Sequence, residues 1–266
     1  MAGSVGCIIH LAKDEEKMDM ILFLTSSPCD DNVPEGYDLP CILFEKNEFV
    51  ANMKKDWKPN CKALIIAANP DNYPLNDEMR ETFYKAFQYH GLTMKELVLC
   101  DKRNADDIKE LVAESEMIIL GGGHVPTAHK FWIEEMKLDK HLKGFEGIIM
   151  GISAGTMLCA DIVYAQPEEG GESIDPEYER FIDGLGLTYI NALPHYQEVR
   201  DKILDGRRLY EDITCEDSYG KQFYTLVDGS YILQKNQKIT LYGEAYLVRD
   251  GKLGKICEDG ESMRIW

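Results

Sequence analysis

The sequence predicts an α/β fold, a three-layer sandwich whose mostly parallel central sheet is covered by helices on both faces. Short runs of consecutive apolar residues, typical of strands buried on both faces, alternate with segments in which apolar residues recur at helical spacing. From Gln222 onward the sequence changes to short alternating strands with Asp-Gly and Asn-Gln turns. Such turns indicate antiparallel hairpins that close the fold.

The apolar runs define the candidate parallel strands. They lie at residues 20–24, 63–68, 96–100, 117–120 and 147–150. A shorter stretch at 41–44 is a candidate for an additional strand. Because right-handed crossovers place the carboxyl ends of parallel strands on one edge of the sheet, we expect the loops after these runs to form a ligand-binding edge.

The segments between and after these runs have the apolar spacing of amphipathic helices. Three of the predicted helices are a long one from about Asp77 to a C-cap glycine at Gly91, a short one over 106–114 and one from Pro126 to about Leu138. A fourth is opened by Asp175-Pro176 and has Tyr178, Phe181, Ile182 and Leu185 on one side. The fifth is a charged helix near 198–210. Glycine just past the last turn is a common helix stop.

Length and composition predict a single domain. The chain has 266 residues, of which 44% are hydrophobic, and this is enough for one sizeable core. We find no internal repeat and no low-complexity linker. We therefore expect one domain over residues 1–266, with residues 1–18 as an N-terminal extension and a core from about residue 18 to 250.

Charge and cysteine usage limit the location and the partners. A formal net charge of -18 repels phosphate backbones, so we expect no nucleic-acid partner. No apolar run approaches the roughly 20 residues of a membrane span, and no secretory signal is visible, so we expect no membrane partner and a cytoplasmic location. The eight cysteines show no CxxC spacing, which favours reduced thiols over a disulfide or zinc framework. We expect a monomer or homodimer.

The motif with the clearest chemistry is Gly-Ile-Ser-Ala-Gly at residues 151–155, directly after the last apolar run. This is the pattern of a nucleophile elbow, in which a strand turns sharply into a helix and projects one serine, here Ser153. A side chain at Gly151 or Gly155 would clash where strand and helix pass closely. The alternative is a glycine-rich turn that only packs, with Ser153 capping the helix.

A serine nucleophile needs a base, an orienting carboxylate and donors for an oxyanion. His195 is the single histidine that follows the elbow, between Pro194 and Tyr196, and the alternative is a surface histidine. Asp228 lies in an Asp-Gly turn and is the candidate carboxylate, although Asp-Gly is also a plain hairpin signal. Glu168 and Glu169 are rivals nearer the nucleophile.

The glycine triplet at 121–123, after the strand at 117–120, is the candidate second half of an oxyanion hole. Its bare amides, together with the N–H of Ala154, could reach a substrate oxygen. The alternatives are a flexible loop or a phosphate cradle, but the triplet lacks the spacings of nucleotide-binding loops. The chain order Ser153, His195, Asp228 argues against an α/β-hydrolase, where the acid precedes the histidine.

Together, Ser153, His195 and the glycine triplet resemble the peptidase E family of serine peptidases, aspartyl dipeptidases related to cyanophycinases with a class I glutamine amidotransferase-like fold. The family pattern is matched, over about residues 18–250, by Gly121-Gly122-Gly123-His124, Gly151-Ile152-Ser153-Ala154-Gly155, Pro194-His195-Tyr196 and Asp228-Gly229.

The resemblance implies a role for each matching residue. Ser153 would be the nucleophile and His195 the general base, with Asp228 as the third member of the triad and Glu168 as a weaker alternative. The amides of Gly123 and Ala154 would form the oxyanion hole. No metal and no organic cofactor would be needed.

Two departures from the family pattern concern the substrate. His124 replaces the usual asparagine after the glycine triplet and becomes a candidate substrate-binding residue. The arginine that anchors an N-terminal aspartate has no secure match. Arg200, Arg207 and Arg208 lie in the corresponding segment with a different spacing, and the alternative is that all three belong to a solvated helix face.

The resulting prediction is a cytoplasmic serine peptidase that hydrolyses short peptides, with dipeptides carrying an N-terminal aspartate as the specific hypothesis. The alternatives are a non-catalytic or ligand-binding member of the amidotransferase-like superfamily, and an esterase or other acyl hydrolase with the same triad. A glutamine amidotransferase is disfavoured because Ser153 stands at the elbow where that chemistry uses cysteine.

Overall fold

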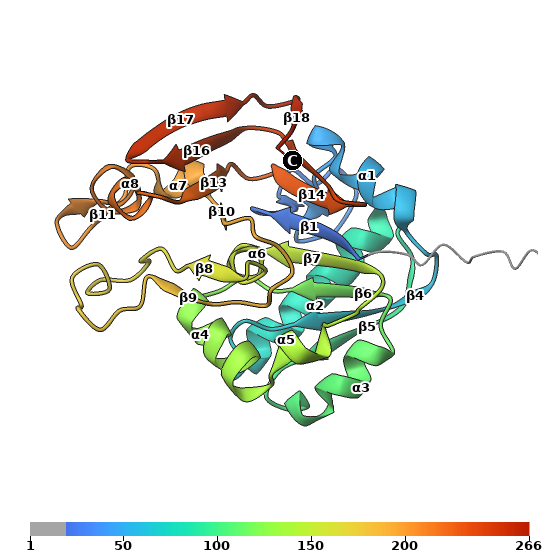
Figure 1. The fold of residues 1–266 in the computed structure, drawn as a ribbon. Coiled ribbons are helices and arrows are strands. Elements are labelled where there is room, and N and C mark those ends of the chain that lie inside the picture. The colour runs from blue at the N-terminus through green and yellow to red at the C-terminus, as the bar shows by residue number, and fades with distance from the viewer. Residues whose placement is uncertain (1–19, 266) are drawn as a thin grey trace, which may run out of the picture.

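A computed structural model describes residues 20–265 of the chain, and its centre is an eight-stranded sheet in the order β18-β15-β14-β1-β7-β6-β4-β5 (Figure 1). The parallel strands are β1 (Ile21–Thr25), β7 (Ile148–Ile152), β6 (Met117–Leu120), β4 (Cys61–Ile66) and β5 (Met94–Cys100). The antiparallel strands are β14 (Tyr231–Lys235), β15 (Lys238–Tyr242) and β18 (Ser262–Arg264). The predicted parallel strands are therefore all present.

Both faces of the large sheet are buried, because successive side chains of each strand enter different cores. In β1, Leu22 and Leu24 belong to one core, whereas Ile21 and Phe23 belong to the other. Side chains of α1 (Phe49–Asp56) and α2 (Tyr73–Tyr89) fill the core around Phe23. Side chains of α3 (Ile108–Ala113) and α4 (Val125–His129) fill the core around Leu22. The three-layer α/β prediction is confirmed.

The remaining helical segments are short. They are the 3₁₀ turns η1 (Lys46–Glu48) and η2 (Ala105–Asp107), the π-helical turns η3 (Lys130–Glu135) and η4 (Leu209–Thr214), and the helices α5 (Leu138–His141), α6 (Ala154–Met157), α7 (Tyr196–Val199) and α8 (Cys215–Asp217). The helix predicted from Pro126 to about Leu138 is α4 continued by η3 to Glu135, and Lys137, with φ at 55°, separates it from α5.

A smaller four-stranded sheet packs its apolar side chains, among them Leu193 and Phe223, into the core around Leu22. It consists of β10 (Ala192–Leu193), β13 (Gln222–Leu226), β16 (Ala245–Arg249) and β17 (Lys252–Cys257). In Figure 1 it lies at the upper left, with helices α3 and α5 toward the bottom.

The predicted hairpin at Asp228-Gly229 is wrong, whereas those at residues 236–237 and 250–251 are present. β13 and β14, which flank Asp228, lie in different sheets. The turn at Asp228 therefore carries the chain from the smaller sheet to the larger one, and it is stabilised by a hydrogen bond from the N–H of Ser230 to the carbonyl of Val227 (2.9 Å). An Asp-Gly pair specifies the turn but not which strands pair around it.

The helix predicted after Asp175-Pro176 is also wrong. Phe181–Asp183 is a strand, β9, that pairs antiparallel with β8 (Ile162–Tyr164). Phe181 packs on the Tyr164 ring, with centroids 5.3 Å apart. The apolar residues therefore pack as part of a strand, and their spacing in the sequence did not distinguish a strand from a helix.

The charged helix predicted near 198–210 is wrong beyond the single turn of α7. Residues Ile203–Leu204 (β11) and Arg207–Arg208 (β12) form a hairpin instead. The two residues between these strands have positive φ angles, 53° at Asp205 and 80° at Gly206. Asp-Gly is the residue pair that such a two-residue turn favours. The sequence therefore contains the turn signal, and the charged residues around it do not form the predicted helix.

The limits of the domain extend further than predicted at one end. β17 and β18 carry the paired strands to Arg264, beyond the expected core limit near residue 250. The predicted N-terminal extension, residues 1–18, lies outside the described residues. The remaining two-stranded element is formed by β2 (Cys29–Asp30) and β3 (Ile42–Leu43).

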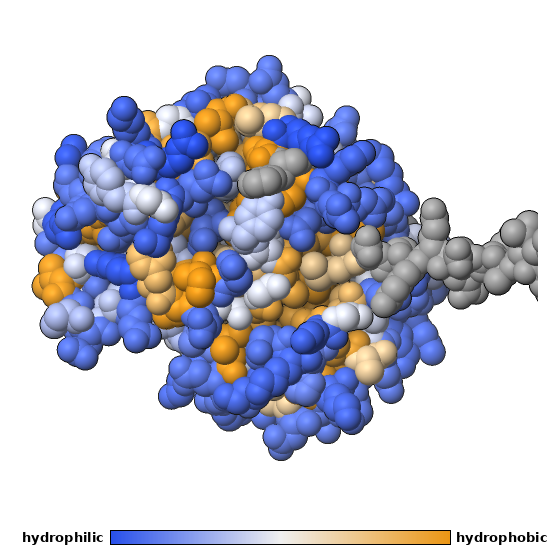
Figure 2. Space-filling view, viewed as in Figure 1, coloured by the Kyte–Doolittle hydropathy of each residue, from blue (hydrophilic) through white to orange (hydrophobic). Residues whose placement is uncertain are grey.

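The surface is dominated by hydrophilic side chains, in keeping with the net charge of -18. Figure 2 shows apolar side chains gathered mainly near the middle of one face, at the level of β1 and β7 in Figure 1. Within residues 20–265, no helix combines the length and apolarity needed to span a membrane.

Close packing at the elbow makes Gly155 a sensitive position. A Cβ atom on Gly155 would overlap the carbonyl oxygen of Leu120, which belongs to β6 and cannot move away freely. We expect Gly155→Ala to lower the free energy of unfolding by about 3 kcal/mol, measured by urea denaturation. Gly254→Ala is the control, because a Cβ there meets no atom within 4 Å. Equal effects of the two substitutions would contradict this account.

Candidate active site

Ser153 stands where β7 ends and α6 begins, in the conformation of a nucleophile elbow. Its φ and ψ angles are 51° and -117°, a strained combination for a residue with a side chain. Its N–H is held by two carbonyl oxygens at the end of β1, those of Thr25 (3.3 Å) and Ser26 (3.1 Å). A Cβ on Gly151 would lie 2.7 Å from the Thr156 Cα, so glycine is required for strand and helix to pass this closely.

The glycine triplet lies beside the serine. A Cβ on Gly122 would lie 3.2 Å from the Cβ of Ser153, so the loop between β6 and α4 borders the nucleophile directly. The amides of Gly123 and Ala154 donate to no acceptor among residues 20–265. Both are therefore available to a substrate oxygen, as the oxyanion-hole prediction requires.

His195 and Asp228 meet although they come from different loops. The Nδ1 of His195 lies 2.9 Å from Oδ1 of Asp228. His195 has a left-handed backbone conformation, with φ at 57°, and precedes α7. This contact engages Nδ1 and leaves Nε2 as the ring nitrogen that is not bound to Asp228. Glu168 makes no hydrogen bond to His195, so the geometry favours Asp228 over Glu168 as the orienting carboxylate.

Ser26 joins the histidine and the aspartate. Its Oγ accepts the N–H of His195 (2.7 Å) and donates to Oδ1 of Asp228 (2.6 Å), and the residue is fully buried. Gln197 also holds Asp228. Its amide nitrogen donates to Oδ2 of Asp228 (2.7 Å), and its amide oxygen accepts the Asp228 N–H (3.1 Å). Both oxygens of the carboxylate are thereby fixed.

These contacts set the charge states of the pair. Burial alone would lower the pKa of His195, but the hydrogen bond and the negative charge of Asp228 outweigh it and raise the pKa above its ordinary value. Burial would raise the pKa of Asp228, but the hydrogen bonds from His195 and Ser26 outweigh it, and the pKa is lowered. Asp228 is therefore ionised at neutral pH and stabilises the protonated histidine.

Ser153 and His195 line the same cavity, which has a volume of about 250 Å³. Its apolar part is built from side chains of the elbow, the 194–202 segment and the following π-helical turn, namely Met157, Pro194, Val199 and Leu209. Its charged residues besides His195 are Glu168, Glu169, Glu198 and Lys202. The cavity therefore contains Ser153 and His195, an apolar wall, and more carboxylates than ammonium groups.

Glu168 has the most altered carboxyl group of the cavity. Burial is the main cause that raises its pKa to about 7, and the charge of Glu172 adds to it, whereas His124 and Lys202 act in the opposite direction. Lys202 donates from Nζ to the backbone carbonyl of Glu168 (2.7 Å). Glu168 thus exchanges a proton near neutral pH, within reach of a substrate in the cavity.

His124, the substitute for the family's asparagine, belongs to a network beside the cavity and does not line it. Its Nε2 lies 2.8 Å from Glu172 and its Nδ1 lies 3.0 Å from the Thr127 hydroxyl. Glu172 in turn accepts the N–H groups of Glu168 (2.7 Å) and Glu169 (2.9 Å). In this structure His124 supports the loop that carries the cavity glutamates.

None of the candidate arginines lines the cavity. Arg200 pairs with its neighbour Asp201 and is more than half exposed. Arg208 makes two hydrogen bonds to Asp212, and Arg207 binds Glu216 and the carbonyl of Asp212. Their predicted place on a solvated face fits this structure better than a role in binding substrate. Lys202 is the single lysine or arginine among the described residues that line the cavity.

Three contributors to the site were missed from the sequence: Ser26, Gln197 and Lys202. Ser26 had a usable signal, since the sequence Thr-Ser-Ser follows the first apolar run and must lie at the ligand-binding edge. Gln197 and Lys202 follow His195 closely, but their orientation depends on the short α7 helix and the hairpin that replace the expected long helix.

Two groups of side chains have donor atoms close enough for a metal ion. His195, Glu198 and Asp228 form one, and His124, Glu169 and Glu172 the other, each with ligand atoms within 4.8 Å of one another. In both groups the histidine is already bound to a carboxylate. Each arrangement is accounted for without an ion.

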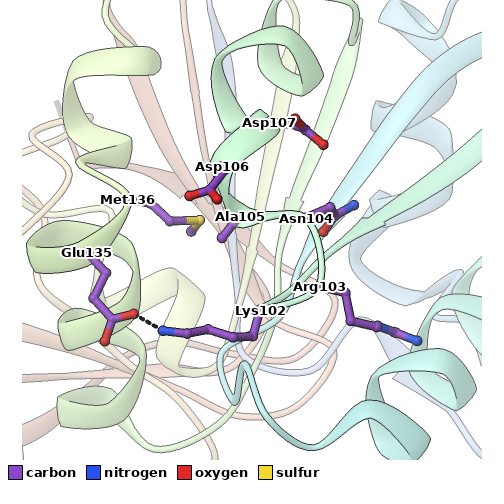
Figure 3. A pocket seen from close by; sticks show the side chains of 8 residues that line it. All are labelled: Lys102, Arg103, Asn104, Ala105, Asp106, Asp107, Glu135 and Met136. Atoms are coloured by element: carbon purple, nitrogen blue, oxygen red, sulfur yellow. Dashed lines mark hydrogen bonds and ion pairs between the residues drawn. The ribbon is translucent and has the colours of Figure 1, made fainter.

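A second, larger cavity of about 350 Å³ lies next to the carboxyl end of β5 and is lined mostly by charged side chains (Figure 3). Lys102 is paired with Glu135 across it, and Arg103 is paired with Asp77 and Asp101. No serine, cysteine or histidine from the described residues lines it. The cavity at Ser153 is the candidate active site because it brings a serine and a histidine together.

Comparisons with known proteins bear on the fold and the family of the chain. One similar solved structure is a peptidase from an acI-B1 Actinobacterium, with a TM-score of 0.64 and 15% identity over 94% of this chain and 98% of that one. Another is a putative peptidase E from Listeria monocytogenes EGD-e, with a TM-score of 0.54 and 15% identity over 90% and 99% of the two chains. No curated protein matches the sequence. The model of peptidase family S51 matches residues 69–242, more than half of the chain, which includes Ser153, His195 and Asp228. The chain therefore belongs to peptidase family S51 and is a serine-type peptidase.

Proposed function

We propose that this protein hydrolyses short peptides through a catalytic triad of Ser153, His195 and Asp228. The observation that carries the proposal is the 2.9 Å contact between His195 and Asp228. The same histidine lines a cavity together with Ser153, whose backbone conformation is strained. A packing serine needs neither a strained backbone nor an oriented base beside it. The arrangement is typical of acyl transfer through a serine.

The proposed mechanism follows from the contacts. Asp228 accepts the Nδ1–H of His195, so Nε2 is unprotonated and takes the proton of Ser153 as its Oγ attacks the peptide carbonyl. The amides of Gly123 and Ala154 stabilise the oxyanion. The imidazolium then gives its proton to the leaving amine, and water hydrolyses the acyl-enzyme by the same steps in reverse order.

The cavity supports a small substrate. Its volume of about 250 Å³ lies below the roughly 300–1,000 Å³ common for pockets that hold drug-sized ligands. A dipeptide or the first residues of a short peptide would fill it. The charges of the cavity also suit a short peptide, because the glutamates can bind its free α-ammonium group and Lys202 can bind its carboxylate.

The same charges bear on the hypothesis of an N-terminal aspartate. Three glutamates line the cavity, and Lys202, the single lysine or arginine among the described residues that line it, is already bound to the Glu168 carbonyl. We therefore propose that neutral and basic N-terminal residues are cleaved faster than aspartate. In a panel of Asp-X, Ala-X and Lys-X dipeptides, Asp-X should be the slowest. Fastest turnover of Asp-X, lost in Lys202→Met, would overturn this in favour of aspartyl specificity.

The experiment that tests the activated serine is labelling with a fluorophosphonate probe. We expect labelling of the native protein and none of Ser153→Ala or His195→Ala, because the probe requires both a nucleophile and its base. Ser115→Ala is the matched control, since its hydroxyl donates only to the Leu111 carbonyl on α3. Intact protein that neither reacts with the probe nor cleaves any dipeptide would refute a catalytic triad.

The ionisation of Glu168 predicts a pH effect on substrate binding. Because burial raises its pKa to about 7, the group is neutral at pH 6 and becomes a carboxylate toward pH 8. KM for dipeptides with a free α-ammonium group should therefore fall severalfold over this interval. Glu168→Gln should remove the dependence of KM on pH while the pH dependence of kcat, set by His195, remains. An unchanged KM profile would argue against contact between Glu168 and the substrate.

A further inference from the structure

Two cysteines outside the catalytic machinery lie in direct contact. The Sγ atoms of Cys29 and Cys41 are 2.8 Å apart, and both residues are free thiols. In the antiparallel β2–β3 pair, Cys29 is opposite Leu43, so Cys41, two residues before Leu43, points to the same face of the ribbon. The contact thus follows from the strand register. No other pair of cysteines in residues 20–265 makes such a contact.

We propose that Cys29 and Cys41 form a reversible disulfide when the protein meets a low-molecular-weight disulfide such as oxidised glutathione. The pair would be a thiol-modification site that closes the loop formed by residues 30–40. Cys29 is partly exposed and gives the oxidant access, whereas Cys41 is buried behind it. The other cysteines of the described chain are buried, and none has a second thiol as a partner.

The reaction is two successive thiol–disulfide exchanges. One thiolate of the pair attacks the oxidant, forms a mixed disulfide and releases one glutathione. The second thiolate attacks the mixed disulfide, forms the Cys29–Cys41 bond and releases the second glutathione. The two electrons of the protein thiols reduce the oxidant, and their two protons balance the two glutathione thiols. The hydrogen bond shared by the sulfurs lowers the pKa of Cys41 and raises that of Cys29, so the thiolate fraction increases at Cys41.

The site adjoins the segment that supports the triad. The N–H of Cys29 donates to the Ser27 hydroxyl (3.3 Å), and the Ser27 carbonyl accepts the N–H of Gly229 (3.0 Å), next to Asp228. A bond at Cys29 would fix the chain three residues beyond Ser26. Because it also removes conformations of the 30–40 loop from the unfolded chain, oxidation should raise the Tm by about 5 °C.

The test uses the full chain with Cys7→Ser, so that a cysteine outside the described residues cannot exchange. After equilibration in glutathione buffers, free thiols are alkylated and the peptides are mapped by mass spectrometry, with Tm measured in parallel. We expect a cross-linked peptide pair containing Cys29 and Cys41, two hydrogens lighter than the reduced pair, and a Tm rise that dithiothreitol reverses. Cys29→Ser and Cys41→Ser should each lose both effects, and Cys215→Ser should keep them.

Two results would overturn the proposal. One is full alkylation of Cys29 and Cys41 in oxidised glutathione, or capture of Cys29 only as a stable glutathione adduct. The other is persistence of the Tm rise in Cys29→Ser. If Cys41→Ser does not fold, the peptide map of the parent protein still shows whether the disulfide forms.

Discussion

Replacing Ser153 with alanine should lower kcat/KM for dipeptide hydrolysis by about 10⁴-fold or more. The substitution removes the proposed nucleophile at the elbow, while His195, Asp228 and the amides of Gly123 and Ala154 remain in place. Alanine has no more Cβ bulk than serine, so the strained backbone at φ 51° can persist and the fold should survive. The measurement is steady-state kinetics on the substrate found with the dipeptide panel.

The control separates loss of the nucleophile from loss of structure. Ser153→Ala should keep its circular dichroism spectrum and still bind a product-like dipeptide, measured by calorimetry. Ser115→Ala should retain full activity because its hydroxyl is bound far from the cavity, at Leu111. Activity of Ser153→Ala within tenfold of the native protein would assign the hydrolysis to another group.

Replacing Asp228 with asparagine should lower kcat by about 10⁴-fold with little change in KM. The carboxylate that accepts from Nδ1 is lost, so the imidazole is no longer held with Nε2 free for Ser153, and the protonated histidine loses its counter-charge. Because Asp228 raises the pKa of His195, the acidic limb of the pH–kcat profile should also move to lower pH in the variant. A purely structural role for Asp228 would not shift that limb.

Neighbouring substitutions give a graded series for comparison. Gln197→Ala leaves the His195–Asp228 contact intact and removes one donor to the far carboxylate oxygen, so we expect a loss of about tenfold. Ser26→Ala removes a hydrogen bond to each of His195 and Asp228 and should lie between Gln197→Ala and Asp228→Asn. If all three variants lose the same activity, the order of roles assigned here is wrong.

The central parallel strands and the elbow could be predicted because both are encoded locally. Apolar runs mark buried strands, and the Gly-x-Ser-x-Gly motif contains the glycines that the close strand–helix passage demands, as the Leu120 oxygen beside Gly155 shows. His195 could be selected because it is the single histidine after the elbow. For the strands and the elbow, the signal lies within a few residues of the feature it specifies, whereas the choice of His195 rests on its place after the elbow in the chain.

What the sequence left open depends on long-range contacts. Asp228 could be proposed as the acid, but its turn joins two sheets, a fact that only strand pairing reveals. Ser26 lies 169 residues from His195 and 202 from Asp228, and nothing near it in the chain announces these partners. The helix predicted near 198–210 does not form, because the turn at Asp205 and Gly206, both with positive φ, pairs β11 with β12 instead.

The end of β1 touches each of the proposed triad residues: its carbonyls hold the amide of Ser153, and Ser26 holds His195 and Asp228. These three residues come from separate stretches of the chain, so β1 acts as their common template. A fragment limited to residues 69–242 would retain the proposed nucleophile, base and acid, and would still lack the strand that gathers them. The three proposed triad residues thus lie within one stretch of the sequence, but the contacts that position them are supplied by β1, outside that stretch.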